Sequence, residues 1–198
     1  MKYINQKDYP HWLYVTRIDL DEADRERGKT TTVASSGCGL CSAIMVADRL
    51  IPNCTFDLND AISLSYEVGA NRRFGTTYAL FAPAFAQKVG LEMEAVKDVQ
   101  AMRQCLRTGG AAVVLVDGDR EGQVGLFTHS GHYMAIIAEE EDGRFVILDP
   151  AFTPDKFDTE GRRGRVEIKN DIFVLCDEAT LLEETKSRAT PFYLFRRK

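Results

Sequence analysis

The pattern of apolar and polar positions divides the chain into a helical first half and a strand-rich second half. Four segments have patterns typical of helices, at 37–50, 56–69, 76–90 and 97–110. Glycines close the last three, as is common at helix C-termini. Pro83 lies inside the third segment, and we expect it to start, kink or divide that helix, because proline lacks a backbone donor.

Strands are predicted from residue 111 onward. The apolar, valine-rich run at 111–118 ends at a glycine and indicates a buried strand. The stretch 132–150 has the pattern of a hairpin, with Asp142 and Gly143 in its turn. Further predicted elements are strands at 164–169 and 191–197 and a helix at about 177–187. Helices followed by strands predict an α+β domain.

Composition narrows the class of protein. The chain has 198 residues, of which 44% are hydrophobic, which is enough for one domain with its own core. We expect that domain to span 1–198, with 1–29 as a polar lead segment packed on it. The formal net charge of −5 argues against a nucleic-acid partner, because such partners favour a basic face.

No apolar run approaches the roughly 20 residues that a membrane span needs, and the N-terminus lacks the apolar core of a signal peptide. A cytoplasmic location without membrane attachment is therefore the expectation. The five cysteines are odd in number and irregularly spaced, which predicts reduced thiols rather than a disulfide framework.

The helix that begins near Cys38 is apolar almost all round, so it should be buried. Ser35 or Ser36 is expected to cap it, and Gly37 and Gly39 leave the surroundings of Cys38 open. The unpaired N–H groups at a helix start lower the pKa of a thiol and can bind an oxyanion. The position therefore suits a nucleophile, although inert packing is the common state of an isolated cysteine.

A cysteine nucleophile needs a base, and that base needs an orienting group. The chain has three histidines, His11, His129 and His132. His132 opens the first strand of the predicted hairpin, and Asp149 ends the second. The turn should fold Asp149 back toward His132, with a bulge or a longer turn absorbing the difference in strand length. A histidine facing an acid in this way follows the logic of a catalytic triad.

These motifs carry a family resemblance. The stretches "ASSGCGLCSAIMVADRL" and "GHYMAIIAEEEDGRFVILDP" resemble the nucleophile and histidine motifs of the C39-like cysteine peptidases of the papain superfamily. The stretch "LRTGGAAVVLV" and the C-terminal pattern are similar in order, so the resemblance covers roughly 30–196. It implies a papain-like α+β fold, with helices followed by a mostly antiparallel sheet. It also implies that Cys38 is the nucleophile, His132 the base and acid, and Asp149 the orienting group.

The resemblance further implies hydrolysis of a peptide or small amide substrate, without a cofactor or a metal. Many papain-like enzymes carry a glutamine six residues before the nucleophile as an oxyanion donor, and this chain has Thr32 there. The candidate donors are the backbone N–H of Cys38 and the hydroxyls of Ser36, Ser35 and Thr32.

The segment before His132 is glycine-rich and should line one side of the site, as functional loops do. Within it, Gly131 and His129 are the candidates for contact with substrate. The sequence leaves the identity of that substrate and the oligomeric state open.

Three alternatives use the same residues. Cys38, Cys41, His129 and His132 form a plausible set of ligands for a structural zinc ion. A redox Cys-x-x-Cys pair is a second possibility, although only polar residues precede it where a strand is usual. The third is a papain-like domain that binds peptides without cleaving them. The position of Asp149 favours the triad, since a closed zinc site has no need of it.

Overall fold

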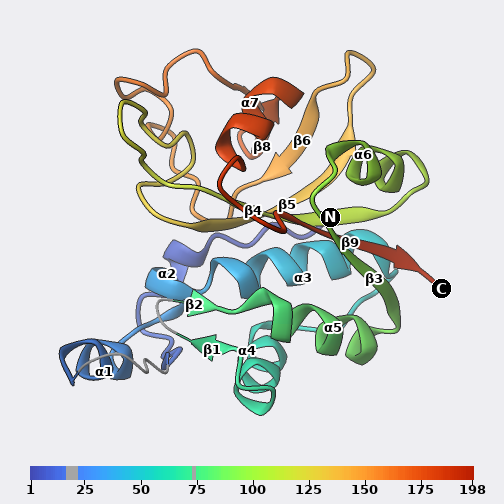
Figure 1. Cartoon of the computed structure of the whole chain (residues 1–198). Coiled ribbons are helices and arrows are strands. Elements are labelled where there is room, and N and C mark those ends of the chain that lie inside the picture. The colour runs from blue at the N-terminus through green and yellow to red at the C-terminus, as the bar shows by residue number, and fades with distance from the viewer. Residues whose placement is uncertain (17–21, 73–74) are drawn as a thin grey trace.

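The computed structural model describes residues 1–16, 22–72 and 75–198 and is built around a seven-stranded antiparallel sheet (Figure 1). In sheet order the strands are β3 (Leu91–Val96), β9 (Phe192–Arg197), β4 (Ala111–Val116), β5 (His132–Glu139), β6 (Phe145–Leu148), β8 (Phe173–Cys176) and β7 (Glu167–Lys169). The short strands β1 (Asn71–Arg72) and β2 (Gly75–Thr76) pair separately. The helices are η1 (Gln6–Asp8), α1 (Glu22–Lys29), α2 (Val33–Ser36), α3 (Cys38–Leu50), α4 (Leu58–Glu67), α5 (Tyr78–Val89), α6 (Val99–Arg107) and α7 (Glu178–Glu184).

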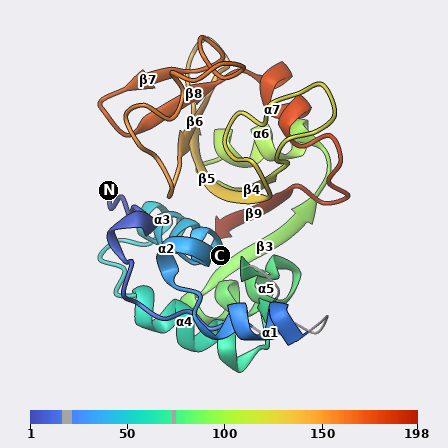
Figure 2. The ribbon, with the colours of Figure 1, turned by 90° about the vertical axis from the view of Figure 1, so that its left-hand side faces the viewer.

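Helices cover both faces of the sheet (Figures 1 and 2). The layer with α3 and α5 shares one apolar cluster with the sheet, and the layer with α6 and α7 shares another. The interior strand β4 contributes to both clusters, Val113 to the first and Val114 to the second. A strand buried on both faces needs apolar residues at every position, which explains its unbroken apolar run.

The predicted α+β organisation is confirmed, and the strand at Leu91–Val96 is an addition to it. Apolar Leu91 and Met93 alternate there with Glu92 and Glu94, which is the period of a half-buried strand. This strand pairs with β9 at one edge of the sheet. The strand-rich part of the fold therefore starts before residue 111.

Pro83 neither starts nor divides its helix, because α5 runs without interruption from Tyr78 to Val89. Phe81 and Phe85 flank the proline, are fully buried, and stack with ring centroids 5.8 Å apart. Burying two aromatic side chains outweighs the loss of one backbone hydrogen bond.

Across the described residues, no helix combines the length and the apolar character that a membrane crossing requires.

The expected cap of α3 is wrong. Its N-cap is Gly37, which offers no side chain, and the serines belong to the preceding helix α2. There the hydroxyl of Ser35 accepts a hydrogen bond from the Thr32 N–H and donates one to the Thr32 carbonyl, both at 3.0 Å. Because α2 ends directly at Gly37, Ser35 and Ser36 satisfy α2 rather than the start of α3.

The hairpin expected at 132–150 is present, and a bulge absorbs its difference in strand length. Ala135 lies opposite Leu148, and the register shifts by one residue between Ile136 and Ala138. The extra residue lets Asp149, which follows β6, return to the level of the start of β5. A β-bulge commonly re-aims side chains near a functional site in this way.

Candidate active site

Cys38 is the first residue of α3 and is half-buried at the helix start. The glycines beside it serve close packing rather than the open surroundings that the sequence suggested. A Cβ at Gly37 would stand 2.7 Å from the Val33 carbonyl oxygen, and one at Gly39 would stand 3.1 Å from the Thr76 side chain. A side chain at either position would push the helix start away from its neighbours.

The Cys38 thiol has a lowered pKa, although burial by itself would raise it. A hydrogen bond with His132 and the positive charge of that ring lower the pKa most, and backbone hydrogen bonds of Tyr133 and Gly39 add to the effect. The thiolate is therefore stabilised by an imidazolium and by N–H groups near the helix start.

His132 is the first residue of β5 and bridges Cys38 and Asp149. Its Nε2 lies 2.8 Å from Asp149 Oδ1, so Nδ1 is the ring nitrogen left for the thiol. Burial would lower the pKa of His132, but the charge and hydrogen bond of Asp149 and the thiolate of Cys38 raise it to about 9. The imidazolium therefore persists through neutral pH.

Asp149 is fully buried and remains ionised. Burial would raise its pKa, whereas the charges of His132 and Lys156 hold it well below its usual range. Its Oδ1 also accepts a hydrogen bond from the Ala151 N–H at 2.8 Å. Because several donors fix this carboxylate, it is suited to hold the His132 ring in one orientation.

The sequence did not identify Lys156, which pairs with the second oxygen of Asp149. It lies in the irregular segment 151–165, between β6 and β7. Its side chain is buried, and Phe152 and Phe157 on either side of it pack into the core. Those two aromatic positions were the only sequence indication that this segment folds inward.

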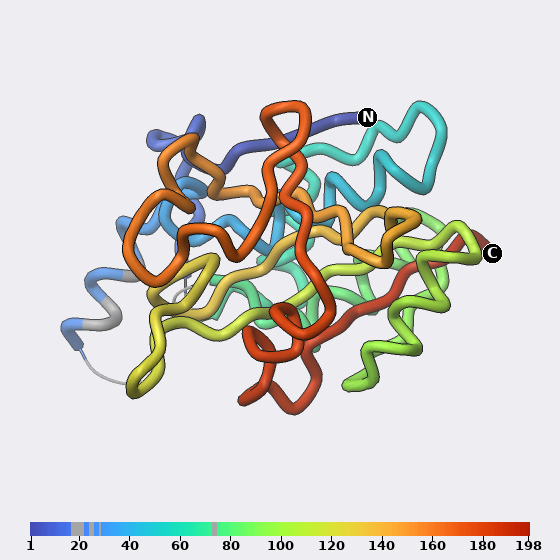
Figure 3. Tube along the Cα trace, turned by 90° about the horizontal axis from the view of Figure 1, so that it is seen from above, coloured from blue at the N-terminus to red at the C-terminus, as the bar shows by residue number. Residues whose placement is uncertain are grey.

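The N-terminal segment also reaches the site. The first residues of the chain lie beside the segment that follows β6 (Figure 3), where the Tyr3 hydroxyl donates to the Asp149 carbonyl at 2.8 Å. The Gln6 N–H donates to the Pro150 carbonyl at 2.6 Å, and Gln6 Nε2 donates to the Ala34 carbonyl at 2.8 Å. Gln6 is buried, and its Oε1 has no partner among the described residues.

A pocket of about 730 Å³ opens over Cys38 and His132. Of the other site residues expected from sequence, Ser35 and Gly131 line this pocket, and Gln6 joins them although the sequence gave no indication of it. Thr32, Ser36 and His129 do not line it.

The four candidate zinc ligands do not converge. His129 lies on an exposed loop, where its Nδ1 is 2.8 Å from Asp119 Oδ2 and its Nε2 is 3.3 Å from an Arg162 nitrogen. Among the residues that the structure describes, no group of three or more His, Cys, Asp or Glu side chains is placed to hold a metal ion. The zinc alternative therefore has no arrangement of ligands to support it.

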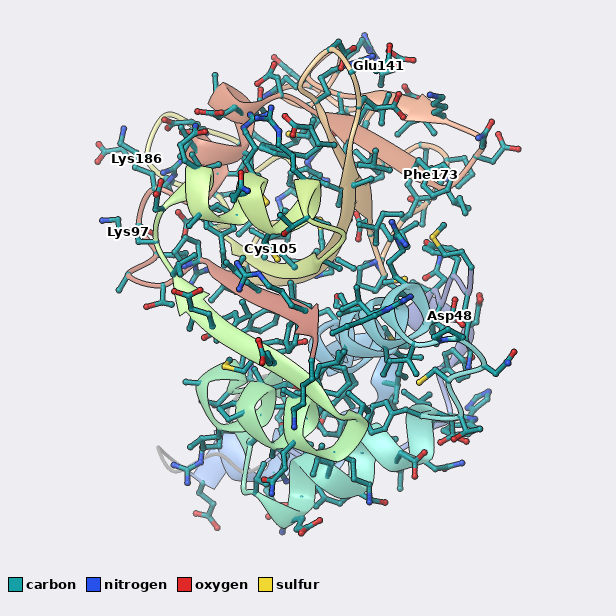
Figure 4. The ribbon with its side chains drawn as sticks, turned by 90° about the vertical axis from the view of Figure 1, so that its right-hand side faces the viewer. Asp48, Lys97, Cys105, Glu141, Phe173 and Lys186 are labelled. Atoms are coloured by element: carbon teal, nitrogen blue, oxygen red, sulfur yellow. The ribbon has the colours of Figure 1, made fainter. Side chains whose placement is uncertain are left out.

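The other thiols differ from Cys38. Cys41 is fully buried one helical turn further along α3, and burial, with the charge of Cys38, raises its pKa. Cys54 is half-buried, and Cys105 and Cys176 are buried, as expected for ordinary packing residues. Figure 4 shows Cys105 beneath α6, in the layer opposite α3.

Comparisons with known proteins identify the fold. No protein-family model matches the sequence, and no curated protein does. Among solved structures, the chain superimposes on the peptidase domain of Streptococcus ComA, a bifunctional ABC transporter involved in a quorum-sensing pathway. That match has a TM-score of 0.50 and 14% identity and covers 94% of this chain and all of that domain. The chain has a C39-like peptidase fold.

A Bacillus anthracis protein described as a C39-like peptidase is also similar, with a TM-score of 0.49 and 11% identity over 82% of this chain and 89% of that one. The α+β papain-like fold expected from sequence is confirmed. At this level of identity the likeness describes the fold, and the chemistry has to be argued from the site itself.

Proposed function

We propose that this C39-like domain is a cysteine-dependent hydrolase of peptide or other amide bonds. In this proposal Cys38 is the nucleophile, His132 the acid and base, and Asp149 the orienting group. One observation carries it: a half-buried thiol of lowered pKa, which lines a pocket, contacts a histidine whose other ring nitrogen is 2.8 Å from a buried carboxylate. Nucleophile, base and orienter within hydrogen-bond reach are the signature of an activated nucleophile.

The first half-reaction is acylation of Cys38. The thiolate attacks the carbonyl carbon of the substrate amide, a C–S bond forms, and the carbonyl oxygen takes up negative charge. The Nδ1 proton of His132 then passes to the leaving nitrogen while the C–N bond breaks. The imidazolium is available for this step because its pKa is raised to about 9.

The oxyanion needs donors that are in place before the reaction. The backbone N–H of Cys38 is one candidate. We assign the second to Gln6 Nε2, which keeps one hydrogen free after donating to the Ala34 carbonyl. Two hydrogen bonds from its own backbone and side chain fix Gln6 in the pocket wall. In this arrangement the N-terminal segment supplies the amide that position 32 lacks.

Deacylation returns the enzyme to its starting state. His132, now neutral, removes a proton from water, and the hydroxide attacks the thioester carbonyl. The C–S bond breaks, the carboxylic acid product leaves, and the thiolate–imidazolium pair is restored. Asp149 stays ionised in both half-reactions, and its negative charge stabilises the imidazolium form of His132.

The test is a screen of peptide libraries with the wild-type protein, Cys38→Ala and Cys41→Ser. Cys38→Ala should abolish hydrolysis and keep the folded structure, because a small side chain at the pocket edge contributes little packing. Cys41→Ser should keep more than about a tenth of the activity, since it takes no part in the chemistry. Equal loss in both variants, or hydrolysis that survives Cys38→Ala, would contradict the proposal.

A further inference from the structure

Apart from the Cys38 thiolate, the charged side chains that line the pocket are positive. Lys7, Arg72 and Arg188 line it, and no Asp or Glu does so among the described residues. The chain as a whole is acidic, with 30 Asp and Glu against 25 Lys and Arg. A pocket of the opposite sign to the rest of the molecule attracts and retains anions.

Arg188 is the best fixed of the three cations. Its Nε lies 2.7 Å from Asp117 Oδ1, and its Nη2 donates to the Val116 carbonyl at 3.0 Å. Asp117 is buried and accepts a hydrogen bond from the Ser187 N–H at 2.9 Å. A guanidinium that these contacts already fix can offer its remaining N–H groups to a ligand in the pocket without a further loss of side-chain freedom.

The backbone beside His132 makes room for this guanidinium. A Cβ at Gly131 would stand 2.9 Å from Arg188 Nη2, so a side chain at that position would displace the arginine. The charges of Arg188 and Cys38 both shift the pKa of the same group, the Tyr133 hydroxyl. Burial is the main cause of its raised pKa, the Cys38 charge raises it further, and Arg188 lowers it.

The pocket lining also includes Tyr78. The Tyr78 side chain is buried, and its hydroxyl makes no hydrogen bond within the described residues. Its ring packs between Tyr133 and Tyr193, with centroids 4.7 Å and 4.8 Å away. A buried hydroxyl without a partner is costly unless a ligand satisfies it.

We propose that the pocket binds a carboxylate of the substrate, held by Arg188 and accompanied by a hydrogen bond from the Tyr78 hydroxyl. The proposal rests on the proposed function and adds the substrate class, a peptide or other amide with an anionic group near the scissile bond. The carboxylate can belong to an acidic side chain or to the C-terminus of a peptide, since both present the same two oxygens.

The test uses two alkylating reagents of nearly equal size that differ by one negative charge, anionic iodoacetate and neutral iodoacetamide. Both react by forming a bond between Cys38 Sγ and the reagent's CH₂ carbon as iodide leaves. Their rate ratio at Cys38 reports attraction of a carboxylate, because a change in thiol reactivity cancels in it. Arg188→Gln should lower the ratio of iodoacetate to iodoacetamide roughly fivefold, as expected for loss of one charge near the thiol.

The matched control is Lys186→Gln, which removes an exposed cation two residues away, outside the pocket (Figure 4). Lys186→Gln should leave the ratio of iodoacetate to iodoacetamide rates unchanged. Arg188→Lys keeps the positive charge, so its ratio should stay close to the wild-type value. Added salt should lower the wild-type ratio more than that of Arg188→Gln. An unchanged ratio in Arg188→Gln overturns the proposal, and so does a parallel fall in both rates. Failure of Cys38 to react with either reagent would instead contradict the proposed function.

Protection experiments identify the source of the carboxylate. Peptides Ac-Ala-Glu-Ala-NH₂ and Ac-Ala-Ala-Ala-OH are compared, as protectants of Cys38 against iodoacetamide, with Ac-Ala-Gln-Ala-NH₂ and Ac-Ala-Ala-Ala-NH₂. Stronger protection by the glutamate peptide assigns the site to an acidic side chain, and stronger protection by the free acid assigns it to a C-terminus. Equal protection by charged and neutral peptides overturns the proposal.

Discussion

Within the described residues, two histidine–aspartate pairs have histidines three residues apart in the sequence, and only one of these pairs is coupled to a thiol. His132 contacts Asp149 at 2.8 Å, and His129 contacts Asp119 at the same distance. The side chains of the first pair are 7% and 0% exposed, and those of the second are 74% and 45% exposed. The two pairs therefore share one nitrogen–oxygen distance, but the first is buried and the second is exposed to water.

The surroundings decide what each pair can do. Between buried charges the interaction is weakly screened, so Asp149, together with Cys38, raises the pKa of His132 to about 9, and the ring supports a thiolate at Cys38. In the exposed pair, water and salt screen the interaction. The free nitrogen of His129 faces the guanidinium of Arg162 instead of a nucleophile. A histidine–aspartate distance is thus insufficient evidence of chemistry without burial and a third group.

The sharpest way to break this comparison is to remove each carboxylate in turn. Asp149→Asn should lower kcat by a factor on the order of 10²–10⁴ with a smaller effect on KM, because the His132 ring loses its orienting charge. Asp119→Asn should stay within about twofold of wild type, because exposed ion pairs contribute little. Steady-state kinetics on a substrate from the library screen measures both. Similar losses in the two variants would show that burial does not distinguish the pairs.

Sequence alone separated these pairs only in part. The apolar helix after Cys38 and the hairpin that ends in Asp149 were readable because periodicity and turn residues specify them. His129 and His132 share the same short segment, and one sits outside the strand while the other starts it. The sequence could therefore rank the two histidines, but it could not show that Asp119 engages the first.

Lys156 and Gln6 were beyond the reach of sequence patterns for a physical reason. Lys156 lies in an irregular segment, and Gln6 belongs to the three-residue helix η1, so no period links either residue to the face that it covers. Gln6 reaches Pro150 and Ala34 across 144 and 28 residues of chain, contacts that only the assembled fold brings about. The N-cap of α3 was missed for a related reason. Ser35 and Ser36 belong to the helix α2, which at four residues is too short to show a periodic pattern in the sequence.

Alkylation at pH 6 sharpens the comparison without a substrate. Iodoacetamide should label Cys38 roughly 100-fold faster than Cys41, because Cys41 is buried and its raised pKa keeps it protonated at that pH. His132→Ala should remove most of this advantage, and His129→Ala should leave it. Peptide mapping of the labelled protein, with metal analysis of the same sample, provides the measurement. Protection of both thiols by a bound metal would contradict the triad.

The pKa values also fix the direction of the pH dependence. The labelling rate should fall as pH drops below the lowered pKa of Cys38, where the thiolate is protonated. Hydrolysis should fall again as pH rises through about 9, where His132 loses the proton that it gives to the leaving group. The two limbs belong to the coupled pair rather than to either residue alone. Asp119→Asn should leave both limbs in place.

Lys156 offers the smallest and most specific change, since it contacts Asp149 without contacting the thiol. Its positive charge competes with the imidazolium for the same carboxylate. In Lys156→Met the whole charge of Asp149 acts on His132, so the alkaline limb should move above its wild-type position while kcat changes by less than about tenfold. Lys169→Met, which removes an exposed lysine from its ion pair with Glu140, is the matched control and should shift nothing.

Stability supplies the second readout for this variant. Asp149 has a folded-state pKa below its unfolded value, so its contribution to stability is present above the unfolded pKa and is lost as pH falls through the folded one. Lys156→Met weakens that contribution at neutral pH, by less than the roughly 3–5 kcal/mol that loss of a sole buried partner costs, because His132 remains. If the free energy of unfolding falls and the alkaline limb stays in place, Lys156 only fastens the segment 151–165 to the domain. A shifted limb means that this lysine also adjusts the acid strength of His132.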